Sequence, residues 1–284
     1  MRLKVAVTGG NGFIGSEIVA ELLRNEVDTL SLQRALKNNA TVKIRQFDLT
    51  KLDNNTYKNL LDIDVVIHTA GLVHDLDSRN EEHTYLNFES TKRLFQICEE
   101  VGVTKFIFLS SVAVYGINSS LQKIDLQSNT SPSSSYGKAK LMSEKYLLDQ
   151  NSKTSISILR LPLVYGINTP GNYGMLEKIS KTKIPLPFLN VKNKRSMISV
   201  MRVAEVVAKI AINRKKNLGL HILVGKKSFS TEGIIKKLRL ENGSLPMLFP
   251  FPPILMKLFL GLIGKKKIYE LLYEDLEFIS TIHN

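Results

Sequence analysis

The sequence predicts an α/β protein with a doubly wound parallel sheet and a smaller C-terminal domain. Short apolar runs rich in β-branched residues alternate with stretches of helical periodicity over the first 160 residues. These runs show no polar alternation, which is typical of parallel strands buried on both faces. The alternation weakens after about residue 166. We therefore expect domains at residues 1–166 and 167–284.

The predicted elements follow in chain order. Strands are expected at 3–7, 27–32, 42–47, 65–67, 105–109, 155–161 and 221–224. Helices are expected after the glycines at 9–15 and at 84–100, 135–148 and 203–212. In the helix at 84–100, the spacing predicts an inward-facing set: Leu86, Leu94, Phe95 and Ile97.

Composition excludes several classes of protein. With 43% hydrophobic and 23% charged residues, the chain is not disordered, collagenous or a disulfide scaffold. Cys98 is the only cysteine, so no intrachain disulfide can form, and this fits a reducing, cytoplasmic setting. The opening apolar run is short and interrupted by Lys4, so it is not a signal peptide.

The net charge of +13 is unevenly distributed. Residues 1–170 carry 19 basic and 18 acidic side chains, whereas residues 171–284 carry 20 and 8. A basic protein invites a nucleic-acid interpretation. However, the sequence shows no nucleic-acid motif and no interleaving of basic and aromatic residues. We expect no nucleic-acid partner, no metal site, and a basic C-terminal domain that binds an anionic substrate.

The stretch from 245 to 264 is apolar and contains a single charge, Lys257. Four prolines within its first nine residues argue against a membrane-spanning helix. We expect a buried helix that covers the second domain, with interfacial membrane contact as the alternative. Residues 178–267 hold 20 basic and 3 acidic residues and end in three lysines, which suits peripheral contact with an anionic membrane at its inner face.

A glycine motif follows the first predicted strand. Gly9, Gly12 and Gly15 precede and open the first helix, followed there by Phe13 and Ile14. Glycines at this spacing permit a tight turn and let the backbone approach a pyrophosphate at a helix N-terminus. The motif predicts a Rossmann-like dinucleotide site, and an ordinary glycine-rich turn is the alternative.

The end of the second strand indicates the choice of cofactor. An acidic residue there would hold the ribose 2′-hydroxyl of NAD, whereas this chain has Arg34, which suits a 2′-phosphate. We therefore favour NADP(H) over NAD(H), with a solvated loop arginine as the other interpretation. Asp48 and Leu49 are expected at the adenine, although Asp48 also suits a turn or a helix cap. Ala70 and Gly71 are small enough to let the dinucleotide pass.

Tyr136 and Lys140 are spaced to share one helix face. An ammonium group beside a phenol is expected to lower the pKa of the tyrosine toward working pH. Ser111 closes the preceding strand at the sheet edge, where its hydroxyl can hydrogen-bond a carbonyl or alkoxide.

Together these segments resemble the extended short-chain dehydrogenase/reductases, the NAD(P)-dependent nucleotide-sugar epimerase/dehydratase family. The resemblance implies catalytic roles for Ser111, Tyr136 and Lys140, and a supporting role for Asn87. It places Pro162 in the segment that passes the nicotinamide. It also implies that Asn172 and Arg195 bind the nucleoside diphosphate.

Departures from the family pattern narrow the expected reaction. The family's 4,6-dehydratases carry an Asp-Glu pair where this chain has Val112 and Ala113, so a dehydratase is disfavoured. The resemblance favours NADPH-dependent reduction of the 4-keto group of a UDP-4-keto-6-deoxy-N-acetylhexosamine, a step toward O-antigen or capsule. The alternative is a UDP-hexose or UDP-N-acetylhexosamine 4-epimerase with tightly bound NAD. A non-catalytic NADP-sensing regulator is a third interpretation.

Two further expectations concern the substrate and the partner. His74 follows the predicted fourth strand and is a candidate sugar contact, with a structural or solvent-facing role as the alternative. The resemblance also implies a homodimer that pairs the helices at 84–100 and 135–148.

Overall fold

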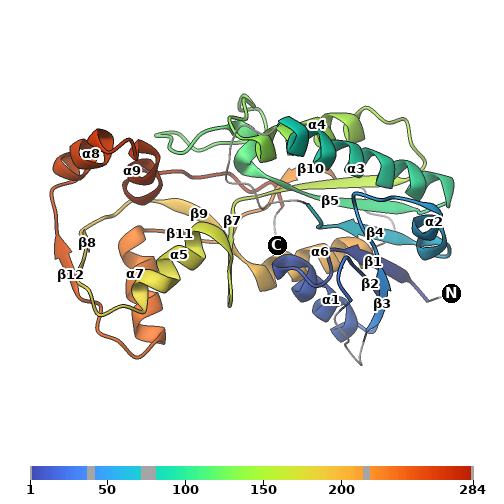
Figure 1. The fold of residues 1–284 in the computed structure, drawn as a ribbon, viewed down its shortest axis with the longest axis horizontal. Coiled ribbons are helices and arrows are strands. Elements are labelled where there is room, and N and C mark those ends of the chain that lie inside the picture. Colours follow the sequence, from blue (N-terminus) through green and yellow to red (C-terminus); the bar gives the residue numbers. More distant parts are fainter. Residues whose placement is uncertain (1, 37–41, 72–80, 214–217, 283–284) are drawn as a thin grey trace.

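A computed structural model describes residues 2–36, 42–71, 81–213 and 218–282. Its main feature is a seven-stranded, wholly parallel sheet in the order β10-β6-β5-β4-β1-β2-β3 (Figure 1). The strands are β1 Lys4–Thr8, β2 Asp28–Gln33, β3 Lys43–Gln46, β4 Val65–His68, β5 Lys105–Ser111, β6 Ser155–Leu161 and β10 Gly219–Ile222. The predicted Rossmann-like α/β class is confirmed.

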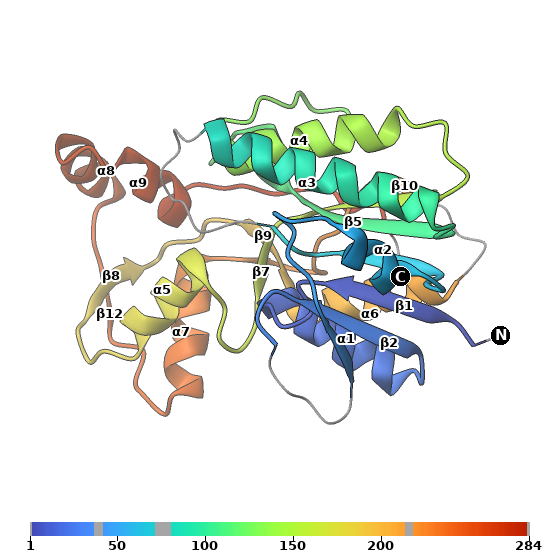
Figure 2. The same ribbon diagram turned by 45° about the vertical axis from the view of Figure 1, so that its right-hand side comes forward.

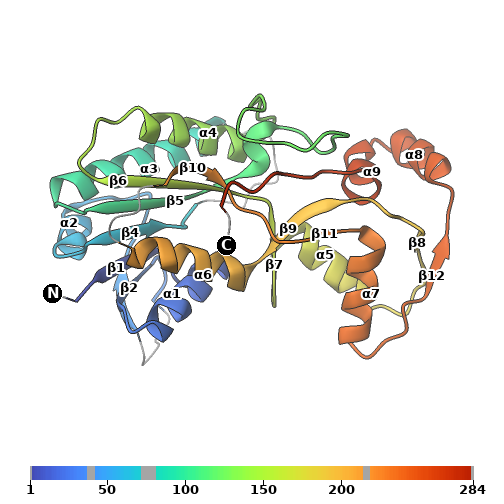
Figure 3. The same ribbon diagram turned by 180° about the vertical axis from the view of Figure 1, so that it is seen from behind.

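Helices cover both faces of this sheet (Figures 1 and 3). One layer contains α1 (Phe13–Arg24) and α6 (Val200–Ile212), and the other contains α3 (Glu81–Glu100) and α4 (Ser135–Leu148), with α2 (Asn54–Leu60) beside α3. Successive side chains of a strand point to opposite faces. Accordingly, Val5 and Val7 join the core beneath α1 and α6, whereas Ala6 joins the core beneath α3. Burial on both faces explains the continuous apolar runs in the sequence.

The strand order reverses next to β1. Thr8, the last residue of β1, is paired with Leu32 of β2 on one side and with His68 of β4 on the other. In open α/β sheets, ligands bind outside the carboxyl ends of the strands at such a reversal. The fold therefore places its main candidate crevice at Thr8.

The C-terminal region adds two small sheets and four helices. The sheets have the orders β11-β9-β7 and β12-β8. Their strands are β7 Leu163–Tyr165, β8 Leu186–Leu189, β9 Arg195–Ser199, β11 Ser228–Phe229 and β12 Leu248–Pro250. The helices are α5 Gly171–Ser180, α7 Thr231–Glu241, α8 Pro253–Leu262 and α9 Lys266–Tyr273. A short 3-10 helix, η1 (Val112–Tyr115), follows β5.

The two predicted domains are not separated by a single crossing of the chain, because later segments return to the large sheet. Helix α6 packs on α1, and β10 extends the sheet beyond β6. Near the end of the chain, Thr281 N donates to Ile222 O at 3.0 Å. The boundary at residue 166 thus stays a prediction, since α6 and β10 pack with the N-terminal domain.

Two expectations about burial are wrong. Leu86 of α3 is 37% exposed, although Leu94, Phe95 and Ile97 are fully buried as predicted. Helix α8 is not buried over the second domain, since its Leu262 is 88% exposed and only Leu260 is classed as buried. Among the helices described, none is long and apolar enough to cross a membrane.

Candidate functional site

The glycine turn creates an open helix N-terminus beside the end of β1. Gly12 N donates to Gly9 O at 2.8 Å, and α1 begins at the next residue with no side-chain cap and no acidic residue in its first turn. A Cβ on Gly15 would lie 2.2 Å from Gly9 O, so only glycine permits this approach. The uncapped N–H groups and the helix dipole favour an anion such as a pyrophosphate.

Gly10 is a residue of this turn that the spacing argument missed. Its Cβ would lie 2.2 Å from Ser31 Oγ of β2. The adjacent Gly-Gly pair was the available signal, because an extra glycine in a strand-to-helix turn indicates a close approach.

The start of α1 also contacts the segment after β6. A Cβ on Gly166 would lie 3.5 Å from the Phe13 ring and 2.6 Å from Val200. Ile14 packs at the edge of the core beneath α1, and Pro162 is buried between β6 and β7. The fold thus brings together the glycine turn and the segment that the family resemblance places at the nicotinamide.

Arg34 and Asp48 follow the neighbouring strands β2 and β3, and Arg34 is exposed directly after β2. The Thr50 backbone N–H and hydroxyl donate to Asp48 Oδ1 at 2.9 and 2.8 Å, and these bonds hold the pKa of the Asp48 carboxyl below its usual value. The charge of Arg34 contributes less to this lowering. Asp48 therefore forms a turn, its alternative interpretation, while Leu49 packs partly buried against the core.

His68 links three elements at the strand reversal. The Thr91 hydroxyl donates to Asn87 O, so it accepts from His68 Nε2, 3.1 Å away, and this leaves Nδ1 to accept from the Thr8 hydroxyl at 2.8 Å. Burial, with a contribution from Lys140, lowers the pKa of His68 to about 3, so the ring is neutral. Thr8 Oγ1 in turn accepts from Ala70 N at 3.3 Å. Sequence reasoning missed this buried histidine.

The small residues after β4 lie next to α3. Gly71 is exposed, and a Cβ there would lie 3.8 Å from Asn87 Oδ1. His74 lies outside the described residues. Asn172 is the second residue of α5, and its side chain also lies outside what the structure describes.

Ser111, Tyr136 and Lys140 meet at the carboxyl edge of β5. Ser111 ends β5 and its hydroxyl accepts from Ala113 N at 3.1 Å. Tyr136 and Lys140 lie on successive turns of α4, with Lys140 Nζ 5.7 Å from the phenol ring centre. Lys140 is buried and donates to Leu109 O at 2.8 Å.

A close approach at Gly137 explains this arrangement. A Cβ on Gly137 would lie 2.6 Å from Ala113 O, so glycine lets the first turn of α4 rest on η1. Ser134 caps the helix by accepting from Gly137 N at 3.1 Å. The neighbouring Tyr136 is thereby held beside Ser111.

The expected lowering of the Tyr136 pKa is wrong. Burial raises the pKa of the phenol, and a hydrogen bond with the Ser111 side chain opposes that rise. Burial also lowers the pKa of Lys140 to about 8, against the attraction of Glu144. Lys140 is therefore mainly protonated at pH 7, with its ammonium on a backbone carbonyl.

A buried ion pair beneath Lys140 was also missed. Arg160 NH2 lies 2.6 Å from Glu144 Oε2, and Ser110 donates to Glu144 Oε1. Arg160 NH1 donates to Tyr115 OH at 2.8 Å. The signal was present, since Arg160 interrupts a buried strand and Glu144 follows Lys140 by one helical turn.

The Arg195 side chain is hydrogen-bonded to backbone carbonyls within the protein. Its guanidinium donates to the carbonyls of Asn118, Glu270 and Glu274 at 3.0–3.2 Å, and burial lowers its pKa. Arg195 thus ties the end of α9 to the loop after η1. Diphosphate binding by Arg195 stays a prediction, and it would require these bonds to be exchanged.

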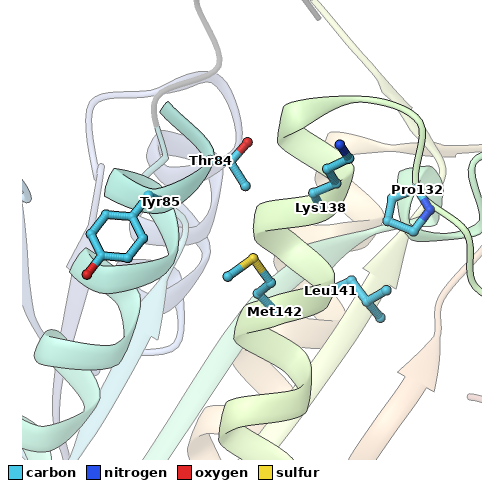
Figure 4. Close-up of a pocket in the computed structure, with 6 residues that line it drawn as sticks. All are labelled: Thr84, Tyr85, Pro132, Lys138, Leu141 and Met142. Carbon is cyan, nitrogen blue, oxygen red and sulfur yellow. The ribbon is translucent and has the colours of Figure 1, made fainter. Parts of the chain in front are cut away.

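A surface pocket lies between α3 and α4, beside the first turns of α4 (Figure 4). Its lining residues are Thr84, Tyr85, Pro132, Lys138, Leu141 and Met142. None belongs to the predicted catalytic or cofactor set. The same two helices are those expected to pair in a homodimer, which stays a prediction.

Comparison with known proteins decides the family. Residues 5–225 match the model of the NAD dependent epimerase/dehydratase family. The chain belongs to this family. A UDP-glucose 4-epimerase from Vibrio cholerae is 26% identical over 98% of this chain and 87% of its own length. A putative UDP-glucose 4-epimerase from Methanocaldococcus jannaschii is 31% identical, covering 80% of this chain and 79% of the relative.

A solved structure shares the fold of this epimerase/dehydratase family member. MoeE5 in complex with UDP-glucose and NAD superposes with a TM-score of 0.76 at 21% identity, covering 99% of this chain and 90% of MoeE5. At that identity the likeness establishes the fold alone.

Proposed function

We propose that this protein is a UDP-sugar 4-epimerase that uses NAD(H). The observation that carries the proposal is the near full-length similarity to a UDP-glucose 4-epimerase, in a chain that places Ser111, Tyr136 and Lys140 at one sheet edge. This was the alternative in the sequence analysis. It now takes precedence over the reductase because the relatives named above are 4-epimerases.

The crevice fits a nicotinamide dinucleotide. The approach of Gly15 to Gly9 O leaves no room for a side chain, and the uncapped start of α1 suits the pyrophosphate. Gly9, Gly12 and Gly15 would hold that group, with Arg34 and Asp48 near the adenosine. When bound, the nicotinamide supplies reversible hydride transfer at sugar C4.

The catalytic residues handle the proton at the sugar 4-oxygen. Tyr136 removes the hydroxyl proton as C4 is oxidised and returns it as the 4-keto group is reduced. Ser111 donates to the same oxygen and stabilises negative charge on it. Lys140, 5.7 Å from the phenol ring centre, would supply positive charge that favours the phenolate. Burial of Tyr136 disfavours the phenolate.

The basic C-terminal region would hold the nucleotide diphosphate. Its net charge provides attraction, and Asn172 and Arg195 are the residues that the family resemblance assigns to it. An epimerase must also let the 4-keto sugar present its other face, which requires a roomy pocket rather than further catalytic groups.

The second candidate is the NADPH-dependent 4-keto reductase. Arg34 favours it, because a guanidinium at the end of β2 suits a 2′-phosphate and a reductase needs exchangeable NADPH. Val112 and Ala113 occupy the positions where dehydratases carry acids, and this agrees with either reaction.

One pair of assays separates the two. Purified protein is given UDP-glucose or UDP-N-acetylglucosamine, and the formation of the 4-epimer is measured by chromatography. NADPH absorbance is followed separately with a UDP-4-keto-6-deoxy-N-acetylhexosamine. We expect interconversion without net NADPH consumption. NADPH loss without interconversion would establish the reductase instead.

The role of Arg34 can be tested directly by calorimetry. If it holds a 2′-phosphate, Arg34→Asp should weaken NADPH binding by roughly 10- to 100-fold and NADH binding by much less. Arg24→Asp is the control. Arg24 lies at the C-terminal end of α1, away from the glycine turn, so this change should leave the affinities for NADPH and NADH unchanged. An equal loss for both cofactors would show that Arg34 does not discriminate between them.

A further inference from the structure

Helix α8 presents a wide apolar face to solvent. Ile254, Leu258 and Leu262 recur every four residues and therefore lie along one side of the helix. Their exposed fractions are 74%, 60% and 88%. Leu255 and Phe259 form a second exposed row beside them.

The opposite side of α8 packs against the protein. Leu260 is buried, and Lys257 Nζ lies 5.5 Å from the ring centre of Tyr269 in α9. Lys257 also lies 3.6 Å from Glu274. Helix α8 is thus held by α9 at the end of the C-terminal region farthest from the N-terminus (Figures 1 and 2). The apolar face of α8 is therefore fixed in position on the protein surface.

Exposed apolar residues also flank the helix in sequence. They are Leu245, Met247 and Phe249 before α8, and Ile263 after it. A contiguous apolar face such as that of α8 is rare on soluble monomers unless it contacts a partner or a membrane.

The charges around α8 favour an anionic partner. The sequence from Asn242 to Tyr269 contains no aspartate or glutamate, yet it contains Lys257 and the run Lys265–Lys267. The three consecutive lysines are exposed between the end of α8 and the first turn of α9. Lys266 lies 3.9 Å from Glu270, so Lys265 and Lys267 provide most of the available positive charge. An exposed apolar helix face with lysines at its end is typical of segments that lie in the interface of an anionic membrane.

We propose that α8 and the lysines at 265–267 dock this protein onto an anionic lipid surface. The apolar rows enter the boundary between headgroups and acyl chains, and the ammonium groups remain among the phosphates. Ten helical residues span only about 15 Å, so the helix lies on the bilayer and does not cross it.

Self-association explains this surface less well. A two-fold interface would apply the same apolar patch to itself. Residues 242–269 contain no carboxylate that could pair with the lysines at 265–267 of a second copy, whereas an anionic bilayer supplies the opposite charge.

Vesicle co-sedimentation tests the proposal. The protein should pellet with vesicles of phosphatidylcholine and phosphatidylglycerol, at least tenfold more than with phosphatidylcholine alone, and less as salt rises. Leu258→Glu with Leu262→Glu should lower binding at least tenfold, whereas Leu121→Glu, at another exposed leucine, should not. Lys265→Gln, Lys266→Gln and Lys267→Gln together should weaken binding more than the same change at Lys58, Lys123 and Lys153.

A fluorescence experiment locates the contact, because the chain contains no tryptophan. Leu262→Trp should give emission that shifts to the blue with anionic vesicles and is quenched by brominated lipid. Leu121→Trp should show neither effect. Turnover of soluble substrate should be unchanged in every variant, because none of these residues belongs to the catalytic edge.

Three results would overturn the proposal: pelleting that ignores lipid charge and salt, pelleting of the double glutamate variant at the wild-type level, or unshifted Leu262→Trp emission. Wild-type self-association in sedimentation velocity that Leu258→Glu with Leu262→Glu abolishes, without lipid binding, would assign the face to a second copy. Capture of a protein partner without lipid binding would likewise reject the membrane.

Discussion

Arg160 and Glu144 form an ion pair inside the sheet domain at 2.6 Å, whereas Lys237 and Glu241 lie 3.8 Å apart on the surface of the C-terminal region. Both side chains of the first pair are almost fully buried, and they also bond Ser110 and Tyr115. Both side chains of the second pair are about half exposed. We propose that the sheet domain holds the reacting groups in register and that the C-terminal region provides surfaces for ligands.

The largest expected effect tests the proposed catalytic role of Tyr136 in the sheet domain. Tyr136→Phe should lower kcat by roughly 10²- to 10⁴-fold, because no group then moves the proton at the sugar 4-oxygen. UDP-sugar affinity, measured by calorimetry, should remain nearly unchanged. Tyr273→Phe is the counterpart in the C-terminal region, where it removes only a hydrogen bond to Pro187 O, and it should retain activity. Activity retained by Tyr136→Phe would refute the assigned role.

The two ion pairs give the next largest difference. Glu144→Gln leaves the buried Arg160 charge without its counter-ion and should lower the free energy of unfolding by about 3–5 kcal/mol. Glu241→Gln, at the exposed pair, should change it by about 0–1 kcal/mol. Urea denaturation of both variants provides the measurement. Equal losses in the free energy of unfolding would show that the buried and the exposed ion pair do not differ in their contribution to stability.

Two glycines sharpen the comparison further. Gly15→Ala forces a Cβ against Gly9 O and should destabilise the protein by about 1–3 kcal/mol while weakening dinucleotide binding. Gly261→Ala meets no atom within 4 Å in α8 and should stabilise the protein by up to about 1 kcal/mol. Thermal unfolding with and without NAD tests both; destabilisation by Gly261→Ala would contradict the open environment of α8.

The smallest effect concerns pH. Burial lowers the pKa of Lys140 to about 8, so its ammonium is mainly present at pH 7 and is lost as pH rises through that value. If the reaction needs this charge, kcat/KM should fall toward about tenfold per pH unit above pH 8. Lys140→Arg should shift the fall to higher pH, whereas Lys237→Arg in the exposed pair should not. An unchanged profile in Lys140→Arg would assign the fall to another group.

The sequence alone predicted the parallel sheet, and it predicted that Ser111, Tyr136 and Lys140 lie together at one sheet edge, because those features have short-range signatures. Apolar runs predicted the seven strands of the sheet, although the last one begins two residues earlier, at Gly219. The glycine turn and the pair Tyr136 and Lys140 depend on spacing within one turn or helix. Their local geometry follows from backbone sterics and helical periodicity.

Sequence patterns could not predict properties that depend on what packs against a residue. Leu86 has core spacing in α3, yet its side chain is 37% exposed. The partners of Arg195 come from segments about 75 residues away in sequence, and Glu144 meets Arg160 only because α4 covers β6. A sequence pattern shows the periodicity of neighbouring residues. It does not show which segment distant in sequence will pack against them.

What the sequence determined by itself was the fold class, the glycine turn before α1 and the spacing that brings Tyr136 and Lys140 to one helix face, since each is encoded in neighbouring residues. Only the tertiary structure decided the protonation tendencies of Tyr136 and Lys140, the neutral His68 between Thr8 and Thr91, and the exposure of α8. The physical reason is that burial and electrostatic environment are sums over neighbours in space. The same apolar sequence is a core helix when a partner covers it and a docking surface when none does.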